Sequence, residues 1–112
     1  MRASELGAQR RAHAPLFAAL GDATRLALIA RLSRGEPCSI AELTAGTKLT
    51  RQAVTKHLRV LERARIVHSR RTGRESRFEL DPRPIESLSL YLDRISAQWD
   101  QALARLRAFV ES

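Results

Sequence analysis

Apolar residues recur every three or four positions along most of this chain, which is the spacing of helices that bury one face. The first such segment spans residues 14–20, with Pro15 near its start, where a helix tolerates proline. Gly21 interrupts the pattern, and Asp22 can cap a second helix that stops at Gly35. This second helix has one apolar stripe, formed by Leu26, Ile29 and Leu32.

The next segment, residues 39–63, has the pattern of two helices joined by a polar turn. Ser39 and Glu42 form a capping box, because the hydroxyl accepts from a backbone N–H while the carboxylate reaches back to the cap residue. A short helix is therefore expected to begin there. After the turn, Thr50 offers a second capping oxygen, and a longer helix is expected from Arg51. This order predicts a helix-turn-helix.

The longer helix of this pair separates its side chains onto two faces. The buried face is expected to contain Val54, Leu58 and Leu61. The opposite face is polar and consists of Arg51, Gln52, Thr55, Lys56 and Arg59. The first four lie in the first two turns, where a recognition helix meets base edges in the DNA major groove. Taken alone, the pattern also fits an ordinary solvated helix surface.

Between Ile66 and Leu80 the period changes from helical to alternating, which predicts two strands. Gly73 lies in the middle of this segment and predicts a hairpin turn. The ribbon over residues 65–80, here called the wing, carries four arginines at its tip and outer face: Arg70, Arg71, Arg74 and Arg77. Such a wing can lie along a phosphate backbone or enter a minor groove. Charges also protect ordinary edge hairpins from aggregation, so this alternative remains open.

A final helical pattern spans residues 84–111, after Asp81 and two prolines. Its apolar residues repeat three and four apart to the end of the chain, which is a heptad seam. A helix of about 26 residues would be about 39 Å long, more than so small a domain needs to cover its own core. The alternative is a helix that folds back as core. We expect a homodimer that uses Leu88, Leu92, Ile95, Trp99, Leu103 and Leu106.

The charge distribution adds to this picture. The chain has 112 residues, enough for one domain, and a formal net charge of +8. Residues 1–80 contain 16 Lys and Arg against 7 Asp and Glu, whereas residues 81–112 contain 4 against 5. The positive charge therefore accompanies the helix-turn-helix, as expected for phosphate contact. Residues 1–13 are expected to form a mobile basic arm.

Several function classes are disfavoured by the sequence. No apolar run of about 18 residues exists to span a membrane, and residues 1–11 lack a secretory pattern, so a cytoplasmic protein is expected. No catalytic spacing or phosphate-cradling glycine loop occurs, so neither an enzyme nor a cofactor is expected. The single thiol, Cys38, is a candidate redox residue because it precedes a helix N-terminus. The alternative is a semi-buried small residue, since the chain has no resolving cysteine.

Three segments in this order resemble one protein family. Residues 20–32, LGDATRLALIARL, are similar to the motif L-x-D-P-T-R-x-x-I-L-x-x-L. Residues 52–61, QAVTKHLRVL, resemble S-x-x-S-x-H-L-x-x-L, and residues 66–74, IVHSRRTGR, resemble a basic wing motif. Together they resemble ArsR-type transcriptional regulators over about residues 14–110. The resemblance implies a mainly α fold with a small β-hairpin wing, a winged helix-turn-helix whose N- and C-terminal helices dimerise.

The chain departs from this family where metal-sensing members bind their ion. Ala23 replaces a proline, which is tolerable, but the paired-cysteine segment of arsenic- and cadmium-sensing members is reduced to Cys38. Members that sense zinc or nickel use Asp and His on the terminal helix, and residues 85–112 contain no histidine. Asp93 and Asp100 are seven residues apart and fit solvated heptad positions. No metal site is therefore expected.

The combined expectation is a dimeric, sequence-specific DNA-binding regulator that represses by promoter occlusion, with no effector implied by the residues. Base contacts are expected from Gln52, Thr55 and Lys56. Backbone contacts are expected from Arg51, His57, Arg59, Arg71, Arg74 and Arg77. Two other classes remain open: a basic architectural protein that coats DNA without sequence preference, and a protein-interaction module.

Overall fold

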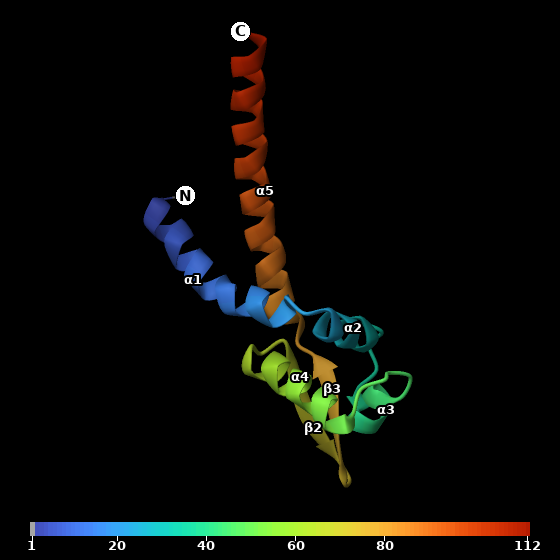
Figure 1. Ribbon diagram of the computed structural model, residues 1–112. Coiled ribbons are helices and arrows are strands. Elements are labelled where there is room, and N and C mark those ends of the chain that lie inside the picture. The colour runs from blue at the N-terminus through green and yellow to red at the C-terminus, as the bar shows by residue number, and fades with distance from the viewer. Residues whose placement is uncertain (1) are drawn as a thin grey trace.

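A computed structural model describes residues 2–112 and shows five helices with a three-stranded antiparallel sheet (Figure 1). The elements in chain order are α1 (Ala3–Leu20), α2 (Ala23–Leu32), β1 (Cys38–Ser39), α3 (Ile40–Thr44), α4 (Arg51–Arg63), β2 (Val67–Thr72), β3 (Glu75–Leu80) and α5 (Pro82–Glu111). The expectation of a mainly α fold with a small β wing is confirmed. Among the helices of residues 2–112, none is long and apolar enough to cross a membrane.

Side-chain caps begin the three helices around the core as the sequence predicts. The α2 cap is Asp22, whose carboxylate accepts from the Arg25 N–H at 3.0 Å. The α3 cap is Ser39, whose hydroxyl accepts from the Glu42 N–H at 3.1 Å. At α4, Thr50 Oγ1 accepts from the N–H of Ala53 at 3.1 Å. Each cap pairs an N–H that a helix start leaves without a partner.

The core lies between α4, α2 and the sheet. The apolar face of α4 is fully buried, as expected, and comprises Val54, Leu58 and Leu61. Facing it are Ile66, Val67 and Phe78 from the sheet and its entry, each at most 1% exposed. Aliphatic side chains with one buried Phe thus fix α4 in place, and its opposite face is left outward.

The sheet contains one strand that the sequence did not predict. Its order is β1-β3-β2, so β3 is the central strand. The β2–β3 hairpin turns at Gly73, which has a φ of +66° that a side chain would disfavour. The extra strand, β1, pairs Cys38 with Phe78 and Ser39 with Arg77. With only two residues it is too short to show an alternating pattern.

The prediction for residues 1–13 is wrong over the part that the structure describes; Met1 lies outside it. Helix α1 runs from Ala3 to Leu20, and Pro15 lies inside it. Residues 3–14 are mostly exposed, so they have no apolar stripe for periodicity to detect. They are nevertheless rich in helix formers such as alanine, glutamate, glutamine and arginine. The sequence signal for this part of α1 was therefore the intrinsic helix propensity of its residues, and not an apolar period.

Helix α1 is joined to α5 through His13. The imidazole stacks on the Tyr91 ring, with centroids 4.7 Å apart, and its Nε2 lies 2.8 Å from Ser87 Oγ. Its Nδ1 lies 2.7 Å from the Gln9 carbonyl oxygen. Both His13 and Tyr91 are buried at this junction. These contacts hold the base of α5 against α1.

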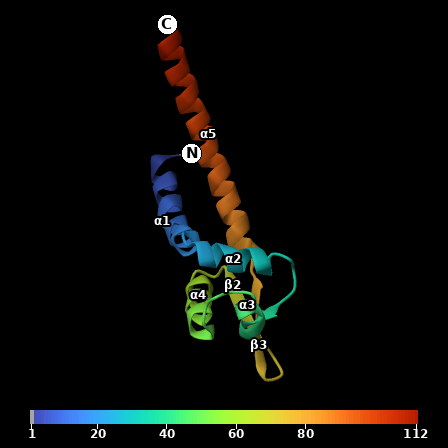
Figure 2. The same cartoon turned by 45° about the vertical axis from the view of Figure 1, so that its right-hand side comes forward.

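Helix α5 extends well beyond the rest of the molecule, on the side opposite the wing tip (Figures 1 and 2). It has 30 residues, and the molecule measures 66 × 28 × 22 Å. The radius of gyration is 18.4 Å, against about 13 Å for a compact domain of this length. Most of α5 therefore covers none of the chain's own core.

Asp81, which begins α5, forms an ion pair with a clear pH consequence. Hydrogen bonds from the Arg83 guanidinium, with Nη2 at 2.6 Å, and from the Arg83 backbone N–H lower the pKa of Asp81 from 3.8 to about 2. Because the folded-state pKa lies below the unfolded one, this contribution to stability is present above about pH 4. It is lost as the pH falls through about 2.

We expect Asp81→Asn to be less stable than the wild type at neutral pH, with the difference shrinking as the pH falls from about 4 to 2. Urea denaturation at a series of pH values measures this. The matched control is Asp93→Asn, which changes an exposed aspartate on the same helix. Parallel pH profiles for wild type and Asp81→Asn would show that this ion pair contributes nothing.

Candidate nucleic-acid interface

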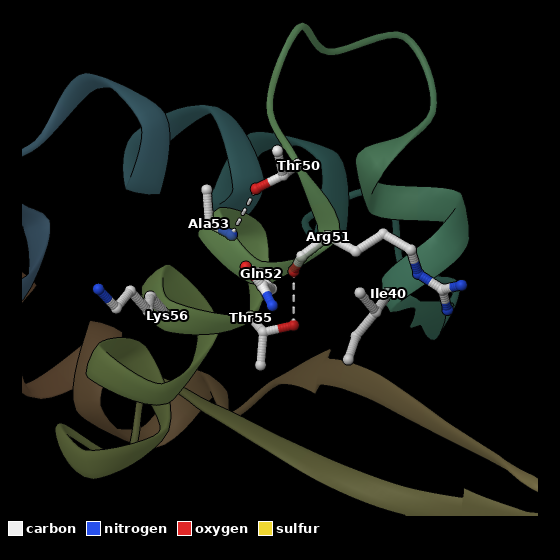
Figure 3. Close-up of a pocket in the computed structure, with 7 residues that line it drawn as sticks. All are labelled: Ile40, Thr50, Arg51, Gln52, Ala53, Thr55 and Lys56. Carbon is white, nitrogen blue, oxygen red and sulfur yellow. Dashed lines mark hydrogen bonds between the residues drawn. The ribbon is translucent and has the colours of Figure 1, made fainter.

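The first two turns of α4 form the candidate reading surface. Arg51, Gln52 and Lys56 are exposed there, and Thr55 is half-buried. These four residues border a shallow hollow on the surface, together with Thr50, Ala53 and Ile40 of α3 (Figure 3). The structure therefore brings the three predicted base-contacting residues, Gln52, Thr55 and Lys56, onto one open surface. Ile40 also borders this hollow, and the sequence reasoning missed it. As the residue after the Ser39 cap, Ile40 was considered only as part of the short helix α3.

Gln52 and Thr55, two of the predicted base-contacting residues, differ in the hydrogen bonds that they can make to a base. Gln52 is exposed, with an amide that can donate and accept. The Thr55 hydroxyl instead donates to the Arg51 carbonyl oxygen at 2.7 Å. Its single donor is thus used within the helix, and only acceptor capacity remains on that oxygen.

His57 lies at the back of α4, toward α2. Its Nδ1 is 3.3 Å from Nη1 of Arg25 and 3.7 Å from Oδ2 of Asp22. His57 Nδ1 thus lies between a guanidinium, which only donates, and a carboxylate, which only accepts. The Arg25 backbone N–H, followed by the Arg25 and His57 charges, lowers the pKa of Asp22 against the opposing effect of desolvation.

Arg25 connects three helices. Its Nε donates to the Ala19 carbonyl oxygen at 2.6 Å and its Nη2 to that of Ala18 at 3.4 Å, which caps the last turn of α1. The same guanidinium reaches His57 on α4. Arg25, near the start of α2, therefore joins α4 to the end of α1.

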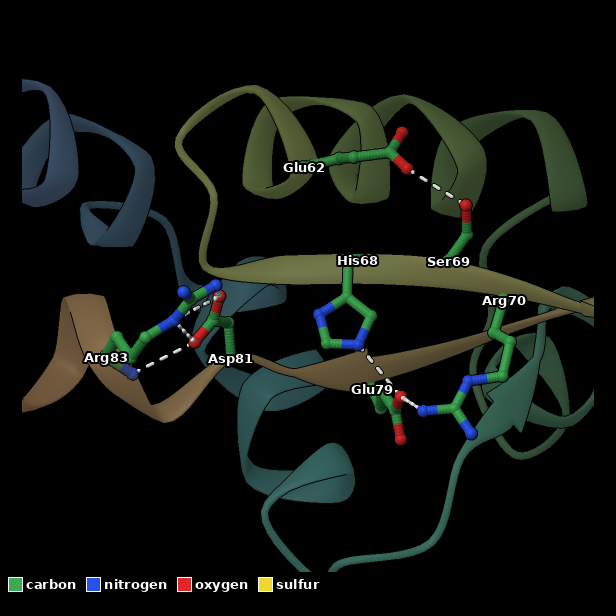
Figure 4. A network of polar contacts seen from close by, with 7 residues as sticks. All are labelled: Glu62, His68, Ser69, Arg70, Glu79, Asp81 and Arg83. Carbon is green, nitrogen blue, oxygen red and sulfur yellow. Dashed lines mark hydrogen bonds and ion pairs between the residues drawn. The ribbon is translucent and has the colours of Figure 1, made fainter.

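At the other end of α4, Arg59 is joined to the sheet through a carboxylate. Its Nη1 lies 2.7 Å from Glu62 Oε1, and Glu62 Oε2 accepts from the Ser69 hydroxyl at 3.1 Å (Figure 4). Glu62 thus bridges α4 and β2, and one of the predicted phosphate contacts is engaged by a protein partner. Arg59 remains half-exposed, at 55% of its side chain.

The wing tip carries the exposed cations Arg71 and Arg74. Within residues 2–112, neither enters a salt bridge. Their neighbour Arg70 pairs with Glu79 on β3, which also lies 2.8 Å from His68 Nε2 (Figure 4). The His68 hydrogen bond, together with Arg70, lowers the pKa of Glu79. Arg71 and Arg74 therefore present their charges to solvent, as a phosphate-binding wing requires.

Arg77 lies on the face of β3 opposite the buried Phe78, as alternation predicts, but its charge is engaged by protein partners. It is half-buried, and its Nη1 lies 3.2 Å from Glu42 Oε1 and 3.3 Å from the Pro37 carbonyl oxygen. Its Nη2 lies 3.3 Å from Glu75. Through its ion pair with Glu42, Arg77 joins β3 to the start of α3.

Cys38 is 5% exposed, and its Sγ lies 3.4 Å from the Glu36 carbonyl oxygen. It forms part of β1, opposite Phe78. This burial favours a packing role for the thiol. Over residues 2–112, no three His, Cys, Asp or Glu side chains gather as a metal-ligand group.

The apolar seam of α5 divides into two parts. Leu88 is buried within the chain itself, at 4% exposure, so its predicted place in a dimer contact is wrong. Ile95 is half-buried. The remaining residues of the seam are open to solvent: Leu92, Trp99, Leu103 and Leu106, with Phe109 and Val110 beyond them. Trp99 alone is 68% exposed, which is unusual for so large an apolar side chain.

Related proteins are transcriptional regulators. Residues 20–70 match a family described as a helix-turn-helix domain. The chain is 37% identical over 94 residues to the HTH-type transcriptional regulator Rv2034 of Mycobacterium tuberculosis, covering 84% of each. It is 40% identical over 67 residues to the transcriptional repressor SmtB homolog of Synechocystis, covering 60% of this chain and 50% of that protein.

Solved structures show the same arrangement of elements. The ArsR-like transcriptional regulator from Rhodococcus sp. RHA1 matches with a TM-score of 0.81 and 34% identity, over 92% of this chain and 94% of that one. A homodimeric winged helix-turn-helix domain from Mycobacterium bovis has a TM-score of 0.65 and 18% identity, over 88% and 89%, and shows the fold alone. The chain therefore belongs to the ArsR family of winged helix-turn-helix transcriptional regulators.

Proposed function

We propose that this protein is a dimeric repressor that reads a specific DNA sequence with α4 and blocks promoter DNA by covering it. The observation that carries the proposal is the start of α4. There a buried apolar face fixes the helix, while Arg51, Gln52 and Lys56 stand exposed above it. The exposed wing arginines extend this surface. A helix that is fixed by its buried face and presents polar and cationic side chains outward fits a DNA major groove.

The side chains divide by role. Gln52 suits adenine N6 and N7, and Lys56 suits guanine O6 and N7. Phosphate contacts are assigned to Arg51, Arg71 and Arg74, which are exposed. His57, Arg59 and Arg77 are engaged by protein partners, so we assign them first to holding the reading surface in place.

The dimer is supported by the exposed part of the α5 seam. An apolar row on a projecting helix, from Leu92 to Val110, needs a partner to remove it from water. A second copy provides an equivalent row, and the Mycobacterium bovis domain of the same fold is described as homodimeric. Two copies would place two α4 helices in successive major grooves, about 10 bp apart. Repression is supported by the name of the Synechocystis relative, a transcriptional repressor.

Selection of bound sequences from a random DNA pool, followed by binding measurements, tests this proposal. We expect a twofold-symmetric operator bound at least about a thousandfold more tightly than random DNA at physiological salt. Equal affinity for selected and random DNA would instead identify an architectural DNA-coating protein. The absence of any DNA binding would point to a protein-interaction module.

Gln52→Ala and Arg74→Ala separate base reading from phosphate contact. Gln52→Ala is expected to lose about 1–3 kcal/mol of discrimination at one position of each half-site, because its amide no longer pairs with a base edge. Arg74→Ala should weaken binding to all sequences alike and reduce the salt slope by about one per half-site. Both effects are read from competition binding at several salt concentrations. An unchanged preferred sequence in Gln52→Ala would contradict the assignment of α4 as the reader.

A further inference from the structure

The hollow on the reading surface, between α3 and the start of α4, has an apolar interior although cations border it. Its walls are mostly carbon atoms, contributed in part by Ile40, Ala53 and Thr55. Ile40 packs partly against the core and leaves the rest of its side chain on this surface. Figure 3 shows Ile40 and Thr55 on two sides of the hollow, with the Arg51 and Lys56 side chains extending away in opposite directions.

The orientation of Thr55 determines what it presents to a ligand. Its hydroxyl donates to the Arg51 carbonyl oxygen at 2.7 Å, which turns Oγ1 along the helix. The other branch of the side chain is a methyl group, fixed by the same bond because a β-branched residue has little χ1 freedom. Thr55 and Ile40 therefore offer aliphatic carbon to whatever enters the hollow.

The charge around the hollow indicates which kind of ligand enters it. Arg51 and Lys56 are exposed at the edges of the hollow, and the chain as a whole carries +8. A purely apolar ligand would not require these cations, whereas a base edge between two phosphate backbones meets both features. In the major groove, thymine is the base that presents an apolar group, its C5 methyl.

We propose that Ile40 and Thr55 together read the C5 methyl of one thymine in each half-site. This assignment rests on the proposed function and adds a specificity that the polar residues of α4 do not supply. It changes the role of Thr55 from a hydrogen-bonding residue to an apolar one, and it adds a residue from outside the reading helix. The same contact accepts a cytosine methylated at C5, whose methyl group lies at the equivalent place in the groove.

The direct test removes the methyl from the DNA and leaves the protein unchanged. Each thymine of the selected operator is replaced in turn by uracil, which keeps every hydrogen-bonding group. We expect one position per half-site at which uracil weakens binding by about fourfold, the value of one buried methyl, and by roughly fifteenfold when both half-sites are changed. The remaining thymines should tolerate uracil.

A matched pair of variants then assigns the effect to Thr55. Thr55→Ser removes the methyl and keeps the hydroxyl, whereas Thr55→Val keeps a methyl of the same shape and removes the hydroxyl. The uracil effect should disappear in Thr55→Ser and persist in Thr55→Val. Ile40→Val, which shortens the other wall by one methylene, should reduce it. Denaturation midpoints confirm that each variant is folded before it is compared.

The results separate the two proposals. If no sequence preference is selected, the proposed function itself fails. If an operator is selected but uracil is tolerated at every position, the methyl contact is wrong and the repressor proposal stands. A uracil effect that survives undiminished in Thr55→Ser would overturn the assignment, because the Thr55 methyl would then make no contact with the thymine methyl.

Discussion

Trp99→Glu and Leu103→Glu should each convert the proposed dimer into monomers and lower operator affinity by at least roughly 100-fold. Both side chains are more than half exposed in the single chain, on the same side of α5. In the proposed dimer they are buried, and a carboxylate there would lose its hydration without a partner. A monomer retains one α4, so it binds one half-site and loses the gain from simultaneous binding of two.

Sedimentation and operator binding at the same protein concentrations measure these two effects. Gln101→Glu is the matched control, because it adds the same charge to the same helix about half a turn away from both residues. It should leave the dimer and its affinity unchanged. Dimers that persist in both Trp99→Glu and Leu103→Glu would show that the seam is not the interface.

Phe78→Ala is expected to lower the free energy of unfolding by about 3–5 kcal/mol. Phe78 lies on the central strand, is 1% exposed and faces the buried side of α4. Its removal leaves a cavity under the helix that is proposed to read DNA. Since total stabilities of small domains are about 5–15 kcal/mol, much of the protein would unfold at modest denaturant concentrations.

Chemical denaturation at one fixed protein concentration measures this loss, because the proposed dimerisation would add a concentration-dependent contribution to the apparent stability. Ser76→Ala is the control, since it changes an exposed residue of the same strand and should alter stability by less than about 0.5 kcal/mol. A cost below about 1 kcal/mol for Phe78→Ala would show that the sheet is not the support of α4.

Local signals were sufficient wherever a helix has a cap and one buried face. Asp22, Ser39 and Thr50 each begin a helix at the predicted place, because a cap depends on groups three residues away. The α4 face of Val54, Leu58 and Leu61 is buried for a similarly local reason, the period of 3.6. The first half of α1 was missed because an exposed helix has no such stripe.

The roles of charged side chains were the least predictable part of the site. Alternation alone places Arg77 on an outer face, but the two-residue strand β1 and Glu42 of α3 meet it there. His57 lies on α4 and was expected to contact the DNA backbone, but it faces Arg25, 32 positions earlier. Both outcomes depend on segments that only the folded chain brings together.

The sequence by itself determined the order of the helices and of the two wing strands, the two faces of α4 and the polar residues on its outward face. These features follow from caps and periodicity, which act over a few residues. Only the tertiary structure decided which arginines stay exposed, that Leu88 is core while Trp99 is not, and that Ile40 borders the α4 surface. The physical reason is that burial and ion pairing depend on distant segments packed against each residue, and no local pattern encodes these neighbours.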